Sequence, residues 1–258
     1  MNNRRMDSVN GRATIIIKRE YWMGVNPINA GFRQLSVLLR GEPEPINQWI
    51  LKWDARRALL YLAIIFAGAG LYGASMGCWR DPLQALYVAI KFPCIVLITV
   101  LGNGLLNGML APLLGLNIGF RQALQAILMS FTISALILGA FSLLVFFLVW
   151  NAPPMSAHSA GTYGVIMLTH VGVIAFAGIA GNLRLAQLLR RLSGSVAVSR
   201  RILFAWLTVN LFLGSQLSWI LRPFIGAPAL PVQFLRPDMF NGNFYETVFA
   251  TIKHLLSP

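Results

Sequence analysis

The sequence predicts an all-α integral membrane protein with about five transmembrane helices and an interfacial amphipathic helix at each end. Of its 258 residues, 57% are hydrophobic and 11% are charged, whereas a soluble domain usually carries about 25% charged residues. The apolar residues fall in blocks of about 20, the length that crosses roughly 30 Å of hydrocarbon as a helix. Lys and Arg are unequally distributed over the flanking segments, with most of them on alternate segments taken together, as expected of a chain that crosses a membrane repeatedly.

Residues 1–57 form a basic N-terminal segment with two expected helices. Asn26 and Pro27 suit the N-cap and first turn of the first helix, and Gly41 is expected to end it. The second helix should lie in the membrane interface, because tryptophan favours the headgroup region. Docking of a cytosolic partner is the alternative role for this second helix. Its predicted apolar face consists of Ile46, Trp49, Ile50 and Trp53.

Residues 58–221 are expected to form the transmembrane bundle. Small residues recur at four-residue spacing in three of its apolar blocks, and such spacing lets helix backbones approach closely. The pattern predicts a tight bundle or an assembly of chains. The small residues are Ala69, Gly73 and Gly77, then Gly104 and Gly108, then Ala177 and Gly181. The five blocks are residues 58–77, 92–114, 122–150, 162–182 and 201–221.

The distribution of Lys and Arg predicts the orientation of these spans. Ten of the 21 basic residues precede the first block, and the five later flanking segments hold two, one, none, five and three. Since positive residues are retained inside, we expect a cytoplasmic N-terminus and a C-terminus on the outer side. Arg80 and Lys91 would then lie in an outer loop, where the Lys91 side chain can snorkel to the surface.

The net charge of +13 predicts membrane lipids as partners, including anionic lipids on the cytoplasmic face. The basic residues cluster beside the apolar blocks, where each contributes about 1 kcal/mol of attraction to anionic headgroups. No nucleic-acid-binding motif accompanies them. We therefore expect no nucleic-acid partner.

Residues 222–258 are expected to form an extracytoplasmic tail, a proline-rich loop followed by an amphipathic helix. Asn243 suits the N-cap of that helix, with Glu246 at its third position. Arg222 ends the fifth span, where its guanidinium can bind a lipid phosphate or the carboxylate of Asp238 or Glu246. A binding role for this outer platform is a hypothesis. The outer platform consists of Trp219, Arg222, Phe224 and Arg236.

Polar side chains fall near the middle of three expected spans, whereas none of the five blocks contains Asp or Glu. The missing carboxylates disfavour a proton-coupled pump. The polar side chains either hydrogen-bond one another between helices or line a substrate site, and both interpretations stay open. This candidate midplane polar site consists of Asn103, Asn107, His170, Asn210 and Gln216.

We predict no catalytic residue, cofactor or metal site. His170 has no obvious second ligand for a haem or a metal ion, and no nucleophile, phosphate-loop or metalloprotease motif is present. The leading expectation is a nonenzymatic membrane subunit or scaffold that contacts other membrane proteins or further copies of itself. A small transporter or channel with a midplane polar site is the alternative, and an intramembrane enzyme ranks third.

Three motifs around the tail and one near residue 84 resemble an uncharacterised family of bacterial multi-pass membrane proteins. They are QLSWILRPFIG from residue 216, FLRP from residue 234 and GNFYE from residue 242, with QALYVAIKFP from residue 84. The resemblance implies a bacterial inner membrane location and brings no established activity. The five-span arrangement with the N-terminus inside is also similar, in topology alone, to Yip1-type membrane proteins.

Overall fold

The computed structural model describes residues 27–156, 160–226, 230–246 and 249. In these residues the chain is all-helical and contains no strand. The chain divides into two compact units, Met1–Ile46 and Asn47–Pro258. The helices are α2 (Pro27–Arg40), α3 (Pro43–Leu51), α4 (Ala55–Gly77), α5 (Pro82–Leu113), α6 (Phe120–Trp150), α7 (Ala160–Ser193) and α8 (Val196–Ile220).

Helix α2 confirms the first of the two expected N-terminal helices. It begins at Pro27 and is followed by Gly41, whose φ of 72° lets the chain leave the helix. The Gly41 amide donates to the Val37 carbonyl at 3.0 Å, and the Glu42 amide donates to the same oxygen at 3.2 Å. The predicted cap, Asn26, lies outside the described residues.

Helix α3 ends before the last residue of the predicted interfacial face. It begins at Pro43, because proline is well suited to the first turn, where no amide donor is needed. It ends at Leu51. The prediction that Trp53 belongs to the apolar face of this helix is therefore wrong. The Arg57 guanidinium lies over the Trp49 ring at 4.8 Å from its centroid, which links α3 to the first turn of α4.

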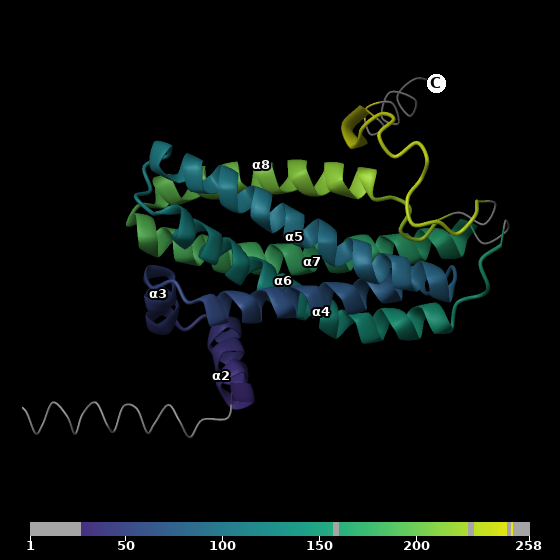
Figure 1. Ribbon diagram of the computed structural model, residues 1–258, viewed down its shortest axis with the longest axis horizontal. Coiled ribbons are helices and arrows are strands. Elements are labelled where there is room, and N and C mark those ends of the chain that lie inside the picture. The colour runs from purple at the N-terminus through teal and green to yellow at the C-terminus, as the bar shows by residue number, and fades with distance from the viewer. Residues whose placement is uncertain (1–26, 157–159, 227–229, 247–248, 250–258) are drawn as a thin grey trace, which may run out of the picture. The chain divides into compact units, whose positions relative to one another are not determined.

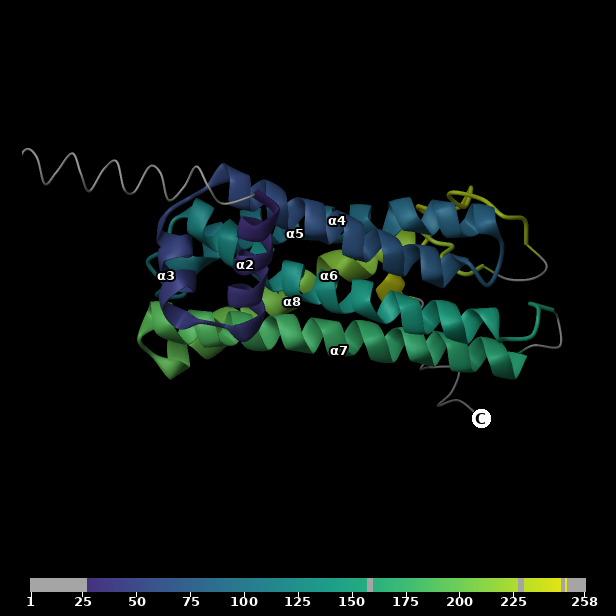
Figure 2. The ribbon, with the colours of Figure 1, turned by 90° about the horizontal axis from the view of Figure 1, so that it is seen from below.

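Five helices of the second unit, α4 to α8, are long and apolar enough to cross a membrane, as predicted. They contain 23, 32, 31, 34 and 25 residues and lie side by side, with consecutive helices running in opposite directions (Figures 1 and 2). At about 1.5 Å per residue all five exceed the roughly 30 Å of a hydrocarbon core, and the three longest do so by more than about 10 Å. The protein is a multi-pass helical membrane protein.

The start of α5 corrects the predicted second span and the predicted position of Lys91. The Asp81 carboxylate accepts from the Leu83 amide at 2.7 Å, and Pro82 occupies the first turn, so the helix begins well before residue 92. Lys91 therefore lies within α5 rather than in a loop. Its side chain is 1% exposed and does not snorkel to the surface.

Small residues hold the bundle together at its centre, where α4 packs against α5 and α6. A Cβ atom at Gly68 would collide with the Ala135 carbonyl of α6, and one at Gly77 would lie 2.6 Å from the Gln84 carbonyl of α5. On α7, a Cβ atom at Gly181 would lie 2.7 Å from the Ser130 carbonyl of α6. Gly77 and Gly181 belong to the predicted small-residue pattern and serve close packing inside one chain, whereas Gly68 is not part of that pattern.

Candidate functional site

Three asparagines of the predicted midplane site meet between α5 and α8. The Asn107 side-chain amide donates to Asn103 Oδ1 at 3.0 Å, and the Asn103 amide donates to Asn210 Oδ1 at 3.3 Å. Asn103 and Asn107 are 2% and 1% exposed. The space beside this trio is a cavity of about 10 Å³, close to the smallest volume that holds one water.

His170 lies apart from the asparagines and pairs with Tyr72 of α4. Its Nδ1 atom is 2.9 Å from the Tyr72 hydroxyl, and the two rings meet edge to face at 5.5 Å between centroids. Asn103 lies in the second half of α5, whereas His170 lies in the first half of α7, which runs in the same direction. The two residues therefore lie toward opposite ends of the bundle, and the expected five-residue cluster does not form.

Gln216 also lies outside the asparagine trio. It is partly buried near the end of α8, and no hydrogen bond within the described ranges joins it to Asn103, Asn107 or Asn210. Of the five candidate residues, the structure thus brings three together.

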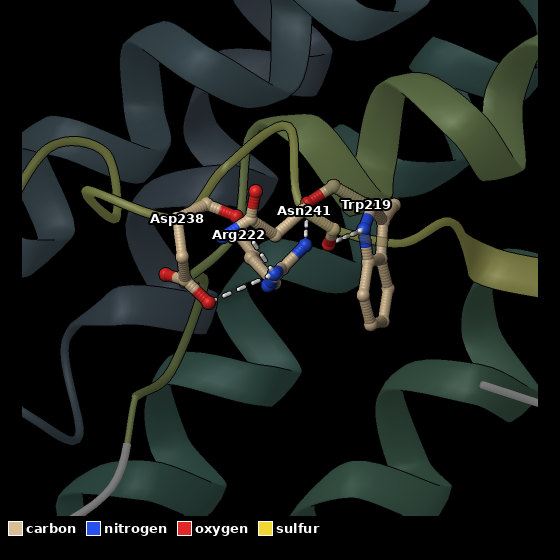
Figure 3. Close-up of polar contacts among 4 residues, drawn as sticks. All are labelled: Trp219, Arg222, Asp238 and Asn241. Carbon is tan, nitrogen blue, oxygen red and sulfur yellow. Dashed lines mark hydrogen bonds and ion pairs between the residues drawn. The ribbon is translucent and has the colours of Figure 1, made fainter.

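The outer platform is built around the Arg222 side chain just beyond α8, as Figure 3 shows. Its guanidinium lies 3.7 Å from the centroid of the Trp219 ring and donates to the Trp219 carbonyl at 2.9 Å. It also forms an ion pair with Asp238 at 3.4 Å, which confirms one of the two predicted carboxylate partners. The Trp219 indole donates to the Asn241 carbonyl at 3.4 Å, so Trp219 and Arg222 fold the tail back onto α8.

Phe224 lies against the interior of the bundle. Its side chain packs against a buried apolar cluster that includes Met76 and Ile225. Its carbonyl accepts from the Gln84 side chain of α5 at 2.7 Å. Phe224, a predicted member of the outer platform, is thus half-buried against the bundle.

Lys91 and Gln84 form a tail clasp that the sequence analysis missed. The Lys91 ammonium donates to the Pro223 carbonyl at 2.8 Å and lies 5.1 Å from the centroid of the Phe234 ring. Gln84 donates to the same Pro223 carbonyl at 3.0 Å. The seven-residue spacing of Gln84 and Lys91 puts them on one face of α5 and is the signal that could have revealed this clasp.

The predicted cap of the C-terminal helix is present. The Glu246 amide donates to Asn243 Oδ1 at 2.9 Å, as expected of an asparagine N-cap. Tyr245 stacks on Phe212 of α8, with ring centroids 5.7 Å apart and planes inclined by 12°. The rest of the predicted C-terminal amphipathic helix, apart from residue 249, lies outside the described residues.

Two larger cavities border these residues. The first, called here the tail-end cavity, has a volume of about 400 Å³; its wall includes His170, Arg222 and Arg236. The second, the mid-bundle cavity, has a volume of about 590 Å³ and lies among α4 to α8. Its wall is mostly apolar and includes Asn182, Asn210 and Ser134.

In the part of the chain that the structure describes, no three His, Cys, Asp or Glu side chains gather in a group that could hold a metal ion. No family model, curated protein or solved structure matches this chain. The fold and the site residues therefore carry the functional argument alone.

Proposed function

We propose that this chain is a nonenzymatic subunit or scaffold of a membrane protein assembly. The observation that carries the proposal is an outward-facing row of small residues on α7. A Cβ atom added at Gly161, Gly164 or Gly172 would meet no atom within 4 Å. These glycines and exposed Ala175 lie on one face of α7. Exposed Leu168 occupies the position on this face between Gly164 and Gly172.

Such a row is suited to contact with a helix of another chain. Without a hydrophobic driving force between helices in lipid, association depends on close backbone approach and van der Waals packing. The opposite face of α7 already uses Ala177 and Gly181 against α6. The outward glycines therefore take no part in the packing of α7 against the other described helices.

The asparagine trio supports the same proposal. Its amides bond one another across α5 and α8, and the adjoining space of about 10 Å³ is far smaller than the roughly 300 Å³ at which ligand pockets begin. The small size of this space supports a role of the trio as a contact between helices.

The experiment places a bulky side chain in the α7 row. Gly164→Ile and Gly172→Ile should each lower the recovery of copurifying membrane proteins, or of a homo-oligomer, after purification in a gentle detergent. Ala67→Ile is the matched control, because Ala67 is exposed on α4 and away from the row. Unchanged assembly in both glycine variants, with thermal unfolding like that of the wild type, would contradict the proposal.

A transporter or channel is the second candidate, and the mid-bundle cavity of about 590 Å³ favours it. Asn210 lines both this cavity and the small space beside the trio. The test is K⁺ or Cl⁻ flux in proteoliposomes. Flux that Asn210→Leu abolishes while assembly remains intact would favour transport, whereas loss of assembly would favour a packing role.

A further inference from the structure

We propose that the tail-end cavity binds an acidic amphiphile, a molecule with one carboxylate or phosphate group and an apolar chain. This inference is independent of the proposed assembly role. The cavity has a volume of about 400 Å³, within the range of about 300–1,000 Å³ that is typical of small-molecule sites. It lies where the tail folds over the end of the bundle.

The first polar residue of the wall is a buried histidine, His170. His170 is 3% exposed, and its Nε2 atom is buried without a hydrogen-bond partner. Its other ring nitrogen is paired with the Tyr72 hydroxyl. When the Tyr72 hydroxyl donates its proton to Nδ1, that nitrogen is the acceptor of the neutral ring. The ring hydrogen then lies on Nε2, which is a hydrogen-bond donor.

Two arginines supply the charge. The Nε atom of Arg236 is buried and has no hydrogen-bond partner, and Arg222 lines the same cavity. Asp238 forms an ion pair with Arg222 and offsets one of the two positive charges. The Lys91 ammonium, which bonds the carbonyl of the wall residue Pro223, adds a third positive charge. The surroundings of the cavity therefore keep a net positive charge, which an anionic group would reduce.

The remaining wall excludes a small, fully hydrated anion as the natural occupant. It is formed largely by apolar side chains, among them Met76, Phe92, Met167, Val171 and Ile174. A polar head against the arginines and His170, with an apolar chain along α7, matches both parts of the wall. This end of the bundle is also where the spans finish, at the depth where lipid headgroups meet protein.

A fatty-acid carboxylate and a phospholipid phosphate share this chemistry, and the probes distinguish them. The full chain in nonionic detergent is titrated with oleate and with dioleoylphosphatidylglycerol, using oleyl alcohol and dioleoylglycerol as matched probes that lack the carboxylate or phosphate. Binding is followed by the intrinsic tryptophan fluorescence of the chain and by the thermal midpoint. We expect saturable binding of at least one anionic probe and none of its matched control.

Variants connect that binding to the cavity. Arg236→Gln should weaken the affinity by about tenfold, since a charge-assisted hydrogen bond is lost. Met167→Trp should block the cavity without a change in charge. Arg191→Gln, which removes a positive charge at the other end of α7, should leave the affinity unchanged. Equal binding of charged and uncharged probes, no saturable binding, or equal effects of Arg236→Gln and Arg191→Gln would overturn the proposal.

Discussion

The Lys91 ammonium donates a hydrogen bond to the Pro223 carbonyl at 2.8 Å, although the two residues are more than 130 positions apart. Both groups are buried in the assembled bundle, where an unpaired charge or carbonyl would be costly. Gln84 shares the Pro223 carbonyl and also bonds that of Phe224. The tail after α8 is thereby held on α5, and it forms one wall of the tail-end cavity.

We predict that the clasp residues compensate for each other. Lys91→Met should loosen the tail only slightly, because Gln84 still serves the Pro223 carbonyl and the cost of burying a charge disappears. Lys91→Met combined with Gln84→Leu leaves two carbonyls without donors and should cost about 2–4 kcal/mol of tail docking. Chymotrypsin cleavage after Phe234 measures the exposure of the tail.

The control for this prediction is Arg33→Met, which removes a basic residue from α2 and touches neither carbonyl. It should leave cleavage after Phe234 at the rate of the wild type. Strictly additive single and double variants, or a double variant as resistant as the wild type, would show that the two side chains do not hold the tail.

Glycines in the centre of the bundle should not tolerate a methyl group. Gly68→Ala would drive a Cβ atom into the Ala135 backbone, and we expect destabilisation of about 1–3 kcal/mol from the overpacking. Gly214→Ala on α8 is the control, since its Cβ atom would meet nothing within 4 Å. Thermal unfolding in detergent compares the two, and similar midpoints would contradict the packing described for α4 and α6.

The number of spans and their approximate positions could be predicted because long apolar blocks have one stable solution in a bilayer. The helix ends could not be predicted from hydropathy, since they depend on local backbone signals. Asp81 and Pro82 start α5 well before the apolar block, and Gly194, with a φ of 61°, lies between α7 and α8. Hydropathy alone places a charged residue such as Lys91 in a loop, because the carbonyl of Pro223 that pairs with its ammonium inside the bundle is not evident from the sequence.

The candidate site was predictable only where residues lie on one helix or at one depth. Asn103 and Asn107 are four positions apart, so their contact follows from helix geometry. The Tyr72 and His170 pair depends on how α4 and α7 are rotated against each other, which no pattern in a single sequence specifies. The ion pair between Arg222 and Asp238 could be predicted because the two residues are close in the sequence, so the tail between them can fold back and bring the carboxylate to the guanidinium.

The asparagine bond between α5 and α8 should be measurable as an energetic coupling. A double-mutant cycle of Asn103→Leu and Asn210→Leu, measured by thermal or denaturant unfolding in detergent, is expected to give about 0.6–2 kcal/mol. Asn151→Leu replaces Asn210→Leu in the control cycle, because Asn151 is exposed at the end of α6 and bonds its own helix. A coupling energy equal to that of the control cycle would show that the asparagine trio does not stabilise the contact between α5 and α8.

The orientation predicted from Lys and Arg can be tested at two connections. In a chain with Cys78→Ala and Cys94→Ala, Pro154→Cys places a thiol between α6 and α7, and Ala197→Cys places one at the start of α8; both positions are exposed. Because the basic residues around α7 and α8 favour the inside, a membrane-impermeant maleimide should label Pro154→Cys in intact cells and Ala197→Cys only after permeabilisation. The reverse labelling pattern would invert the topology and place the tail-end cavity on the cytoplasmic face.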